Sequence, residues 1–317
     1  MNTANADAYI HADGHVLAAI DGSSYTESVC RHAAWAAERL VAPLQFVHVI
    51  ERARETAPVD LSGSLALGEQ ETLLLELSAL DERRSALAQQ RGRLLLEDAR
   101  RLAGQAGARA DAIDTRLRHG GLVDTLSELE GDVRLFVLGK RGEQATEPEP
   151  TGVEQAQQNE RVEQNEAAKE PLGTEVERVV RTVHRPLLVA PREFQPIDRV
   201  LVAFDGSATT RKGVQMIAAS PLFRGLEVHV VTAAAASERV TQDLQWAGQT
   251  LTVAGFEAHT AHADGDAETV IGRYAREQRI DLLVMGAYGH SRIRELIVGS
   301  TTTAMLRRCR LPVLLLR

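Results

Sequence analysis

Glycine and hydroxyl residues near the end of the chain have a spacing that could hold an anion. Gly286 and Gly289 lie three residues apart after an apolar run, and Gly299 and Ser300 follow ten residues later, where a helix is predicted to begin. Glycine lets a ligand approach the backbone, and the first amides of a helix are unpaired and favour negative charge. Ser300 and Thr301 could add hydroxyl donors. The spacing predicts a loop around a polyphosphate; the alternative is that these glycines only form turns.

Charged residues near this loop could complete a nucleotide site. Asp205 ends another apolar run, and the carboxyl ends of parallel strands form the edge where ligands bind. A carboxylate there could accept hydrogen bonds from ribose hydroxyls, although Asp-Gly-Ser is also a good turn or helix-cap sequence. Arg292 and Arg294 lie within the loop, where they either neutralise phosphate or are solvated charges.

The elements that must position these residues occur twice in the chain. Residues 15–23 read HVLAAIDGS and residues 199–207 read RVLVAFDGS. Three further pairs of segments match in the same order: 43–50 with 226–233, 132–142 with 280–289, and 169–191 with 294–317. Ordered matches of this kind indicate two homologous domains.

Strand-like runs alternate with helical stretches throughout both copies. This alternation predicts βαβ units and a mostly parallel sheet, and the runs are continuously apolar, as in sheets covered on both faces. The predicted fold class is therefore α/β, with two tandem open parallel five-stranded sheets and about four helices each, in a Rossmann-like three-layer arrangement. The proline-containing stretch at 191–199 predicts domains at 1–193 and 194–317.

Two segments depart from the repeat. Residues 69–107 predict a long helix, in which leucines recur every seven residues but the companion heptad positions are polar. We favour a helix packed on the sheet or on the sister domain over a coiled coil. Residues 143–170 contain eight Glu against one Arg and one Lys, with few large apolar groups, which favours a flexible loop.

The carboxyl-terminal motif, together with LVAFDGS and the ending LPVLLL, resembles the universal stress protein family. The segment from Gly286 to Ser300 is similar to that family's G-2x-G-9x-G-[S/T] nucleotide signature. The resemblance covers nearly the whole chain as two tandem domains and implies the adenine nucleotide alpha hydrolase-like fold. Its ATP-binding branch would imply ATP, with or without Mg²⁺, in the second domain. There, Ala203, Ala233 and Met285 would lie beside adenine, Asp205 at the ribose, and Gly286, Gly289, Gly299, Ser300 and Thr301 around the ribose and phosphates.

The first copy keeps the corresponding residues, namely Asp21, Gly139, Gly142, Gly173 and Thr174. Thirty residues separate Gly142 from Gly173, where the family pattern has nine. Loop lengthening costs little closure entropy, so the domain should fold, but a phosphate loop needs a short return path and an acidic insert repels ATP. We expect a weakened or lost site in the first domain. The alternative is that the insert loops outward and leaves both ends in place.

The resemblance implies a stress-response protein in which ATP is a ligand more than a substrate. Slow ATP hydrolysis or another nucleotide-transforming activity of the same fold is an alternative, but IDGSSY and FDGSAT after the first strands differ from the HIGH-type and SGGxDS-type loops of such enzymes. A ligand-free assembly module is a third hypothesis, and it fits the first domain better than the second.

The composition of the chain disfavours several classes of binding partner. Net charge is -8 and aromatic residues make up 4%, which disfavours nucleic acid. The two cysteines show no zinc signature, and no signal peptide or apolar stretch suited to a membrane span is visible, so we expect a cytoplasmic protein. The last strands, 186–191 and 312–317, are apolar edges whose mutual pairing would form an intramolecular pseudo-dimer. The long helix could support a homodimer.

Overall fold

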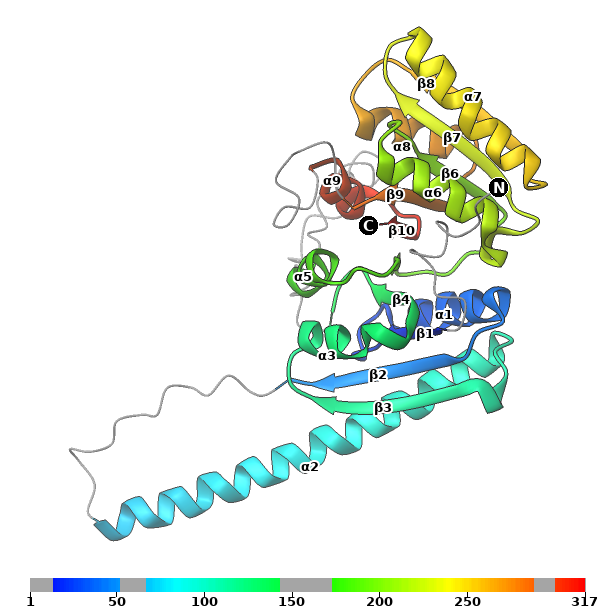
Figure 1. Cartoon of the computed structure of the whole chain (residues 1–317). Helices are drawn as coiled ribbons and strands as arrows, with labels where there is room; N and C mark the ends of the chain where they lie inside the picture. Colours follow the sequence, from blue (N-terminus) through cyan, green and yellow to red (C-terminus); the bar gives the residue numbers. More distant parts are fainter. Residues whose placement is uncertain (1–13, 52–66, 143–172, 288–299, 317) are drawn as a thin grey trace, which may run out of the picture.

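The computed structural model describes residues 14–51, 67–142, 173–287 and 300–316, with the side chains of 67–74 excepted. The predicted insert at 143–170 therefore lies outside the described residues. Figure 1 shows the chain coloured along its sequence.

The first half of the chain contains five strands separated by helices (Figure 1). Its elements are β1 (His15–Ala19), α1 (Thr26–Leu40), β2 (Leu44–Ile50), α2 (Leu67–Gln105), β3 (Ile113–His119), α3 (Leu122–Leu129), β4 (Val133–Gly139), α5 (Thr174–Thr182) and β5 (Leu187–Ala190). The second half repeats this order. Its elements are β6 (Arg199–Ala203), α6 (Ala208–Ala219), β7 (Glu227–Ala233), α7 (Glu238–Val253), β8 (Ala258–Ala263), α8 (Ala267–Glu277), β9 (Leu282–Gly286), α9 (Ser300–Arg308) and β10 (Val313–Leu316).

The strands form one sheet in the order β3-β2-β1-β4-β5-β10-β9-β6-β7-β8. Neighbouring strands are parallel within each half, as the sequence predicts, and the two halves share the strand order 3-2-1-4-5. Strands β5 and β10 pair antiparallel, with Leu188 opposite Leu314. The two five-stranded sheets are thus joined edge to edge into ten strands, which covers two apolar edges that would otherwise be open.

Helices cover both faces of this sheet and give the predicted three layers. Alternate strand residues point to opposite faces: Val16 belongs to one apolar cluster and Leu17 to the other. Helices α1, α2, α6 and α7 contribute to the first cluster, and α3, α5, α8 and α9 to the second. Burial on both faces explains why these strands read as continuous apolar runs.

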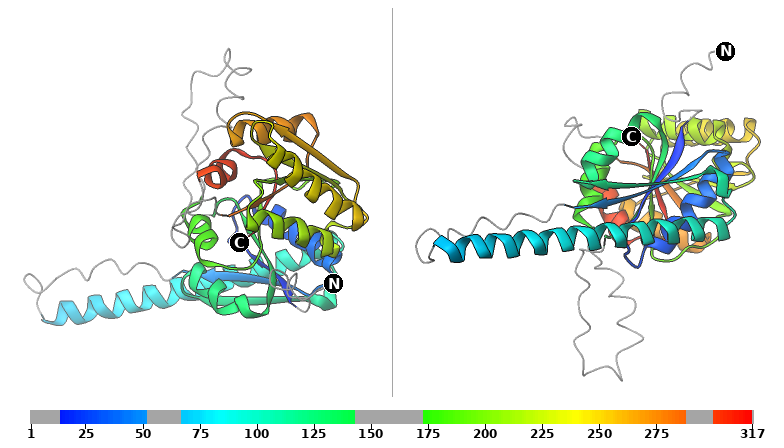
Figure 2. Two further views of the ribbon diagram at one scale, coloured as in Figure 1. Left: turned by 45° about the horizontal axis from the view of Figure 1, so that its top comes forward. Right: turned by 90° about the horizontal axis from the view of Figure 1, so that it is seen from below.

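Helix α2 confirms the predicted long helix, but only its second part packs on the domain. Leu96, Ala99 and Ala103 are buried where the helix contacts α1, β2 and β3. The first part extends away from the body of the molecule (Figures 1 and 2). Leu80 and Leu87 are 60% and 65% exposed, so the expectation of a helix packed along its length is only partly right. Heptad spacing reports which residues share a face, not what covers that face.

Polar contacts also hold the two halves together. The Lys140 ammonium, just after β4, donates to the carbonyl oxygens of Arg307 and Cys309 at 2.8 and 3.1 Å. The Arg307 guanidinium pairs with Glu177 of α5 at 3.0 Å. On the other face, Arg39 of α1 donates to the Leu222 carbonyl oxygen at 2.6 Å. The carboxyl end of the first half-sheet therefore lies beside the end of α9 that precedes β10.

Candidate functional site

The predicted nucleotide residues of the second half lie at the carboxyl ends of three adjacent strands. Strand β6 lies between β9 and β7, and the three strands end at Ala203, Gly286 and Ala233. These three small residues are half-buried, and Met285 beneath them is buried. Asp205 lies two residues after the end of β6 and is exposed. We call this edge the second rim; it combines small apolar surfaces with a carboxylate.

The start of helix α9 is tied to the same rim. The Thr302 hydroxyl donates to the carbonyl oxygen of Gly286 at 3.0 Å, and Thr302 is buried. This bond places Ser300, which is exposed, and Thr301, which is half-buried, beside the end of β9. The sequence motif did not single out Thr302, although its position in a Ser-Thr-Thr-Thr run at a helix start was an available signal.

The other predicted residues of this loop fall outside the described part of the chain. They are Gly289, Arg292, Arg294 and Gly299. Their contribution rests on the sequence pattern.

Asp205 is held in place by the turn that the sequence offered as an alternative. Its Oδ1 accepts hydrogen bonds from the Ser207 amide at 2.9 Å and from the Thr210 hydroxyl at 2.7 Å. Gly206 has φ +71°, and a methyl group there would lie 2.4 Å from an oxygen of Asp243. The turn therefore fixes the carboxylate at the rim before any ligand arrives, and the two interpretations of Asp205 are compatible.

The first half repeats this arrangement around Asp21. Its Oδ1 accepts from the Ser23 amide at 3.0 Å. A methyl group on Gly142 would lie 2.8 Å from the other oxygen of Asp21, so these residues nearly touch. The Gly173 amide donates to the Lys140 carbonyl oxygen at 3.2 Å, and Thr174 follows as the first residue of α5.

The ends of the acidic insert are therefore adjacent. A methyl group on Gly173 would lie 3.6 Å from the amide nitrogen of Gly142, despite the thirty residues between them in sequence. The described residues fit the alternative in which both ends stay in place, and insert length alone does not separate the two glycines. Loop length and end separation are independent quantities, which is why the sequence left this open.

A tyrosine distinguishes the first rim from the second. Tyr25 is buried, and a methyl group on Gly139 would lie 2.7 Å from its Cβ. The matching position in the second copy, counted from the two Asp-Gly-Ser turns, is Thr209. The first rim thus has a large side chain packed over the end of β4 where the second has a small one.

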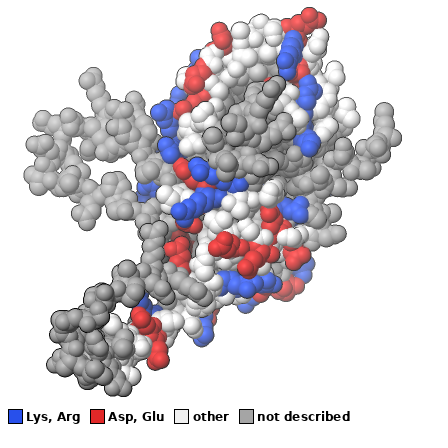
Figure 3. Space-filling model, turned by 60° about the vertical axis from the view of Figure 1, so that its left-hand side comes forward, with Lys and Arg blue, Asp and Glu red and all other residues white. Residues whose placement is uncertain are grey.

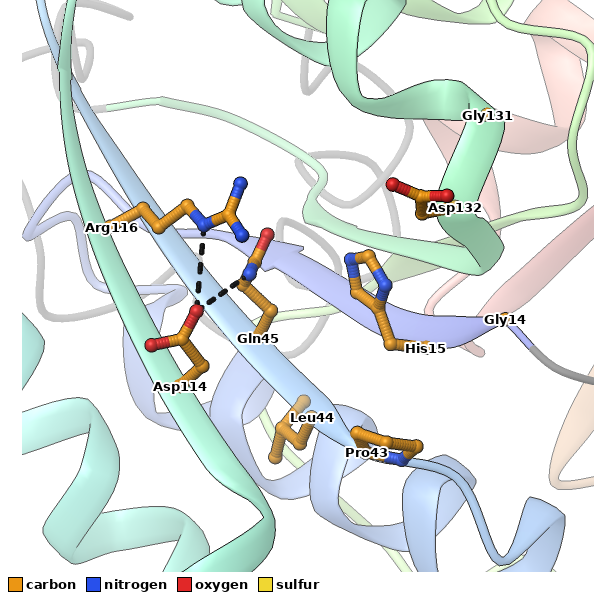
Figure 4. Close-up of a pocket in the computed structure, with 9 residues that line it drawn as sticks. All are labelled: Gly14, His15, Pro43, Leu44, Gln45, Asp114, Arg116, Gly131 and Asp132. Carbon is orange, nitrogen blue, oxygen red and sulfur yellow. Dashed lines mark hydrogen bonds and ion pairs between the residues drawn. The ribbon is translucent and has the colours of Figure 1, made fainter.

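A cavity of about 420 Å³ lies in the first half, at the opposite edge from its Asp21 rim (Figure 4). It is lined by polar groups at the beginnings of β1, β2 and β3. The Gln45 amide donates to Asp114 at 2.8 Å, and Arg116 pairs with the same carboxylate at 3.4 Å (Figure 4). Burial lowers the pKa of His15 at its wall, and Asp132 opposes this shift. None of the predicted nucleotide residues that the structure describes lines this cavity.

Charge on the described surface is mixed. On the face in Figure 3, Lys and Arg alternate with Asp and Glu, and no large area of the described residues on that face is basic alone. Among the described residues, no helix combines the length and apolar character required to cross a membrane. Cys30 is buried, Cys309 is half-buried, and both are free thiols.

Comparison with known proteins identifies the family of this chain. The model of the Universal stress protein family matches residues 14–191 and 196–317. The chain is 36% identical over 307 residues to "Universal stress protein Slr1230" of Synechocystis sp., covering 96% of this chain and 99% of that protein.

Solved structures show the same fold. A universal stress protein from Archaeoglobus fulgidus superposes with a TM-score of 0.64 at 17% identity, covering 96% of this chain and 97% of that chain. A putative universal stress protein from Pseudomonas aeruginosa gives a TM-score of 0.58 at 15% identity, covering 98% of this chain and 94% of that chain. With the duplicated α/β halves and the two Asp-Gly-Ser rims, these matches show that the chain belongs to the universal stress protein family.

Proposed function

We propose that this chain binds ATP at its second rim and acts in stress response through a conformational or partner-binding change. One observation carries the proposal: Asp205, the small strand-end residues and the first turn of α9 lie at one edge, where the Thr302 bond to Gly286 holds the start of α9. An anion beside unpaired helix amides and a sugar beside a carboxylate are both favourable arrangements.

The rim suggests how each part of the nucleotide would be held. Adenine would lie against Ala203, Ala233 and Met285, because the two alanine side chains leave room for a flat ring beside the methionine. Asp205 would accept from the ribose hydroxyls. The phosphates would meet the α9 amides with Ser300 and Thr301, and the sequence motif adds Gly289, Arg292 and Gly299. Mg²⁺ would accompany the phosphates as it does in solution.

The first rim should bind more weakly. Tyr25 packs over the end of β4, and the adjoining insert carries eight Glu, which disfavours a polyphosphate. We therefore expect one ATP per chain instead of two.

Isothermal titration of the full chain with ATP tests this proposal. Asp205→Ala is expected to weaken binding roughly 10- to 100-fold, because a hydrogen bond to a charged group contributes about 1.5–3 kcal/mol. Asp21→Ala makes the same change in the same turn of the other half and should leave the affinity unchanged. Gly289→Trp should abolish binding by filling the loop.

A stoichiometry of two, or equal losses from the two aspartate variants, would contradict the assignment to the second rim. Failure of the wild-type chain to bind added ATP, when no nucleotide is carried through purification, would remove the proposal altogether. Analysis of the same samples for ADP separates a ligand role from slow hydrolysis.

A further inference from the structure

Two histidines and a glutamate meet at the edge of the second half, away from the second rim. His229 of β7 is directly opposite His259 of β8 in the parallel pair, and Glu227 begins β7. The Glu227 Oε1 lies 2.9 Å from Nε2 of His229 and 3.2 Å from Nε2 of His259. One ligand atom from each of the three residues lies within 4.8 Å of the others.

Neighbouring groups orient this triad. The Tyr274 hydroxyl of α8 lies 3.0 Å from Nδ1 of His229, which leaves Nε2 of that ring facing the carboxylate. Arg199 of β6 binds the other oxygen of Glu227 at 3.1 Å. His229 is buried, whereas the side chain of His259 is 45% exposed, so an ion could enter from solvent. Supported rings and one open side are typical of metal sites.

The fold does not require these residues, as the duplicated half shows. The strand registers place Gln45 and Asp114 of the first half where the second has His229 and His259. The position of Glu227 is Pro43 there. The same sheet location therefore forms without any of the three, and their gathering in the second half is a property of this sequence.

We propose that Glu227, His229 and His259 bind a divalent transition-metal ion of the zinc class. Two imidazole nitrogens and one carboxylate oxygen are a donor set that zinc accepts with water in a fourth position. Ligand atoms around tetrahedral zinc lie about 3.3 Å apart, for bonds of about 2.0–2.1 Å. This is near the 2.9 and 3.2 Å that separate the Glu227 Oε1 from the Nε2 atoms of the two histidines. With the metal on Nε2, the Nδ1–H of His229 donates to the Tyr274 oxygen. The ion ties the edge strand β8 to β7.

Competition of tag-free full-length protein against a chromophoric zinc chelator tests this site. One Zn²⁺ per chain is expected to bind. His259→Ala should lower the affinity for Zn²⁺ by more than about 100-fold because a ligand is lost. Tyr274→Phe keeps all three ligands but removes the orienting oxygen, so a loss of about 10- to 100-fold is expected. His262→Ala removes an exposed histidine of the same strand and should change nothing.

Co²⁺ absorption in the visible range reports the coordination directly and should be lost in His259→Ala. His259 carries the test because it is exposed, whereas replacing buried His229 could disturb the fold. Zinc binding that is unchanged in His259→Ala, or absent from the wild-type chain, overturns the proposal. ATP titration is a separate readout, so either proposal can fail alone.

The projecting part of α2 carries a second, independent feature. Glu76, Asp81 and Glu82 precede the basic residues Arg83 and Arg84 along this exposed segment. The exposed leucines that share one face of this part of the helix are Leu77, Leu80 and Leu87. A leucine stripe open to water on a segment with segregated charge is unusual for a helix without a partner.

We infer that this segment pairs antiparallel with the same segment of a second copy of this chain. Antiparallel pairing puts the acidic part of one helix beside the basic part of the other, whereas parallel pairing would oppose like charges. The leucine stripes then face each other, and the aliphatic stem of Arg84 covers them at a polar heptad position.

Sedimentation velocity of the full chain tests the pairing. The wild-type chain should approach twice the mass of one chain as its concentration rises. The double variant Leu80→Glu with Leu87→Glu should sediment with the mass of a single chain. Val253→Glu adds a charge at an exposed apolar site of α7 and serves as the control.

Charge reversal tests the direction of pairing. Arg83→Glu with Arg84→Glu should weaken the dimer, and adding Asp81→Arg with Glu82→Arg should restore it, because the charges are then exchanged in both chains. A wild-type chain that stays monomeric, or a dimer untouched by the leucine changes, overturns the inference; failure of the restoration overturns the antiparallel arrangement.

Discussion

Leu314→Ala is expected to lower the free energy of unfolding by about 3–5 kcal/mol. Leu314 of β10 is opposite Leu188 of β5, and both are 1% exposed at the junction of the two halves. Truncation there removes buried apolar surface and leaves a cavity that two strands and the helices above them cannot easily fill. Urea denaturation followed by circular dichroism measures the loss.

The position, not the loss of apolar groups as such, should decide this result. Val253→Ala shortens an 88% exposed side chain on α7 and should change stability by less than about 0.5 kcal/mol. Leu188→Ala combined with Leu314→Ala should cost less than the sum of the two single changes, because both enlarge one cavity. A loss below about 1 kcal/mol from Leu314→Ala would contradict the packing of the junction.

Acidification should destabilise the protein through His32. Burial lowers the pKa of His32 to about 4, against the opposing hydrogen bond to the Ser28 carbonyl oxygen at 2.8 Å. The unfolded chain, with a histidine pKa near 6.5, binds a proton that the folded chain rejects. The contribution of His32 to the free energy of unfolding is therefore fully present above pH 6.5. It falls by roughly 3 kcal/mol as the pH drops to 4.

The pH dependence of His32→Asn isolates this contribution. Asparagine stays neutral, and its amide can replace Nδ1 as donor to Ser28, so the variant should lose about 3 kcal/mol less than wild type between pH 7 and pH 4. Other buried groups titrate in both proteins and cancel in the difference. Parallel stability curves for the two proteins would contradict a neutral buried imidazole in the folded state.

Much of the fold could be predicted from the sequence, because its signals are local and repeated. The two Asp-Gly-Ser turns, the apolar strands and the alternation with helices each appear twice, so each copy supports the assignment of the other. The parallel arrangement within each half and the positions of Asp205 and Gly286 at strand ends follow from these signals, whereas the long α2 helix follows from its own leucine period.

The features that escaped prediction depend on contacts between distant residues. Tyr25 over Gly139 requires knowing how α1 meets β4, and the adjacency of Gly142 and Gly173 depends on the fold around the insert. Glu227, His229 and His259 lack the close spacing of a zinc motif and meet only through strand register. The exposed first part of α2 has the same period as a buried helix, so periodicity could not reveal its surroundings.

The antiparallel contact of β5 with β10 determines which rim a binding partner can reach. The strands of one half are antiparallel to those of the other, so the Asp21 rim and the Asp205 rim lie at opposite ends of the strands. A partner that binds across one end of the strands would contact one rim and not the other. ATP bound at the Asp205 rim, as proposed, would therefore be accessible only to a partner at that end of the strands.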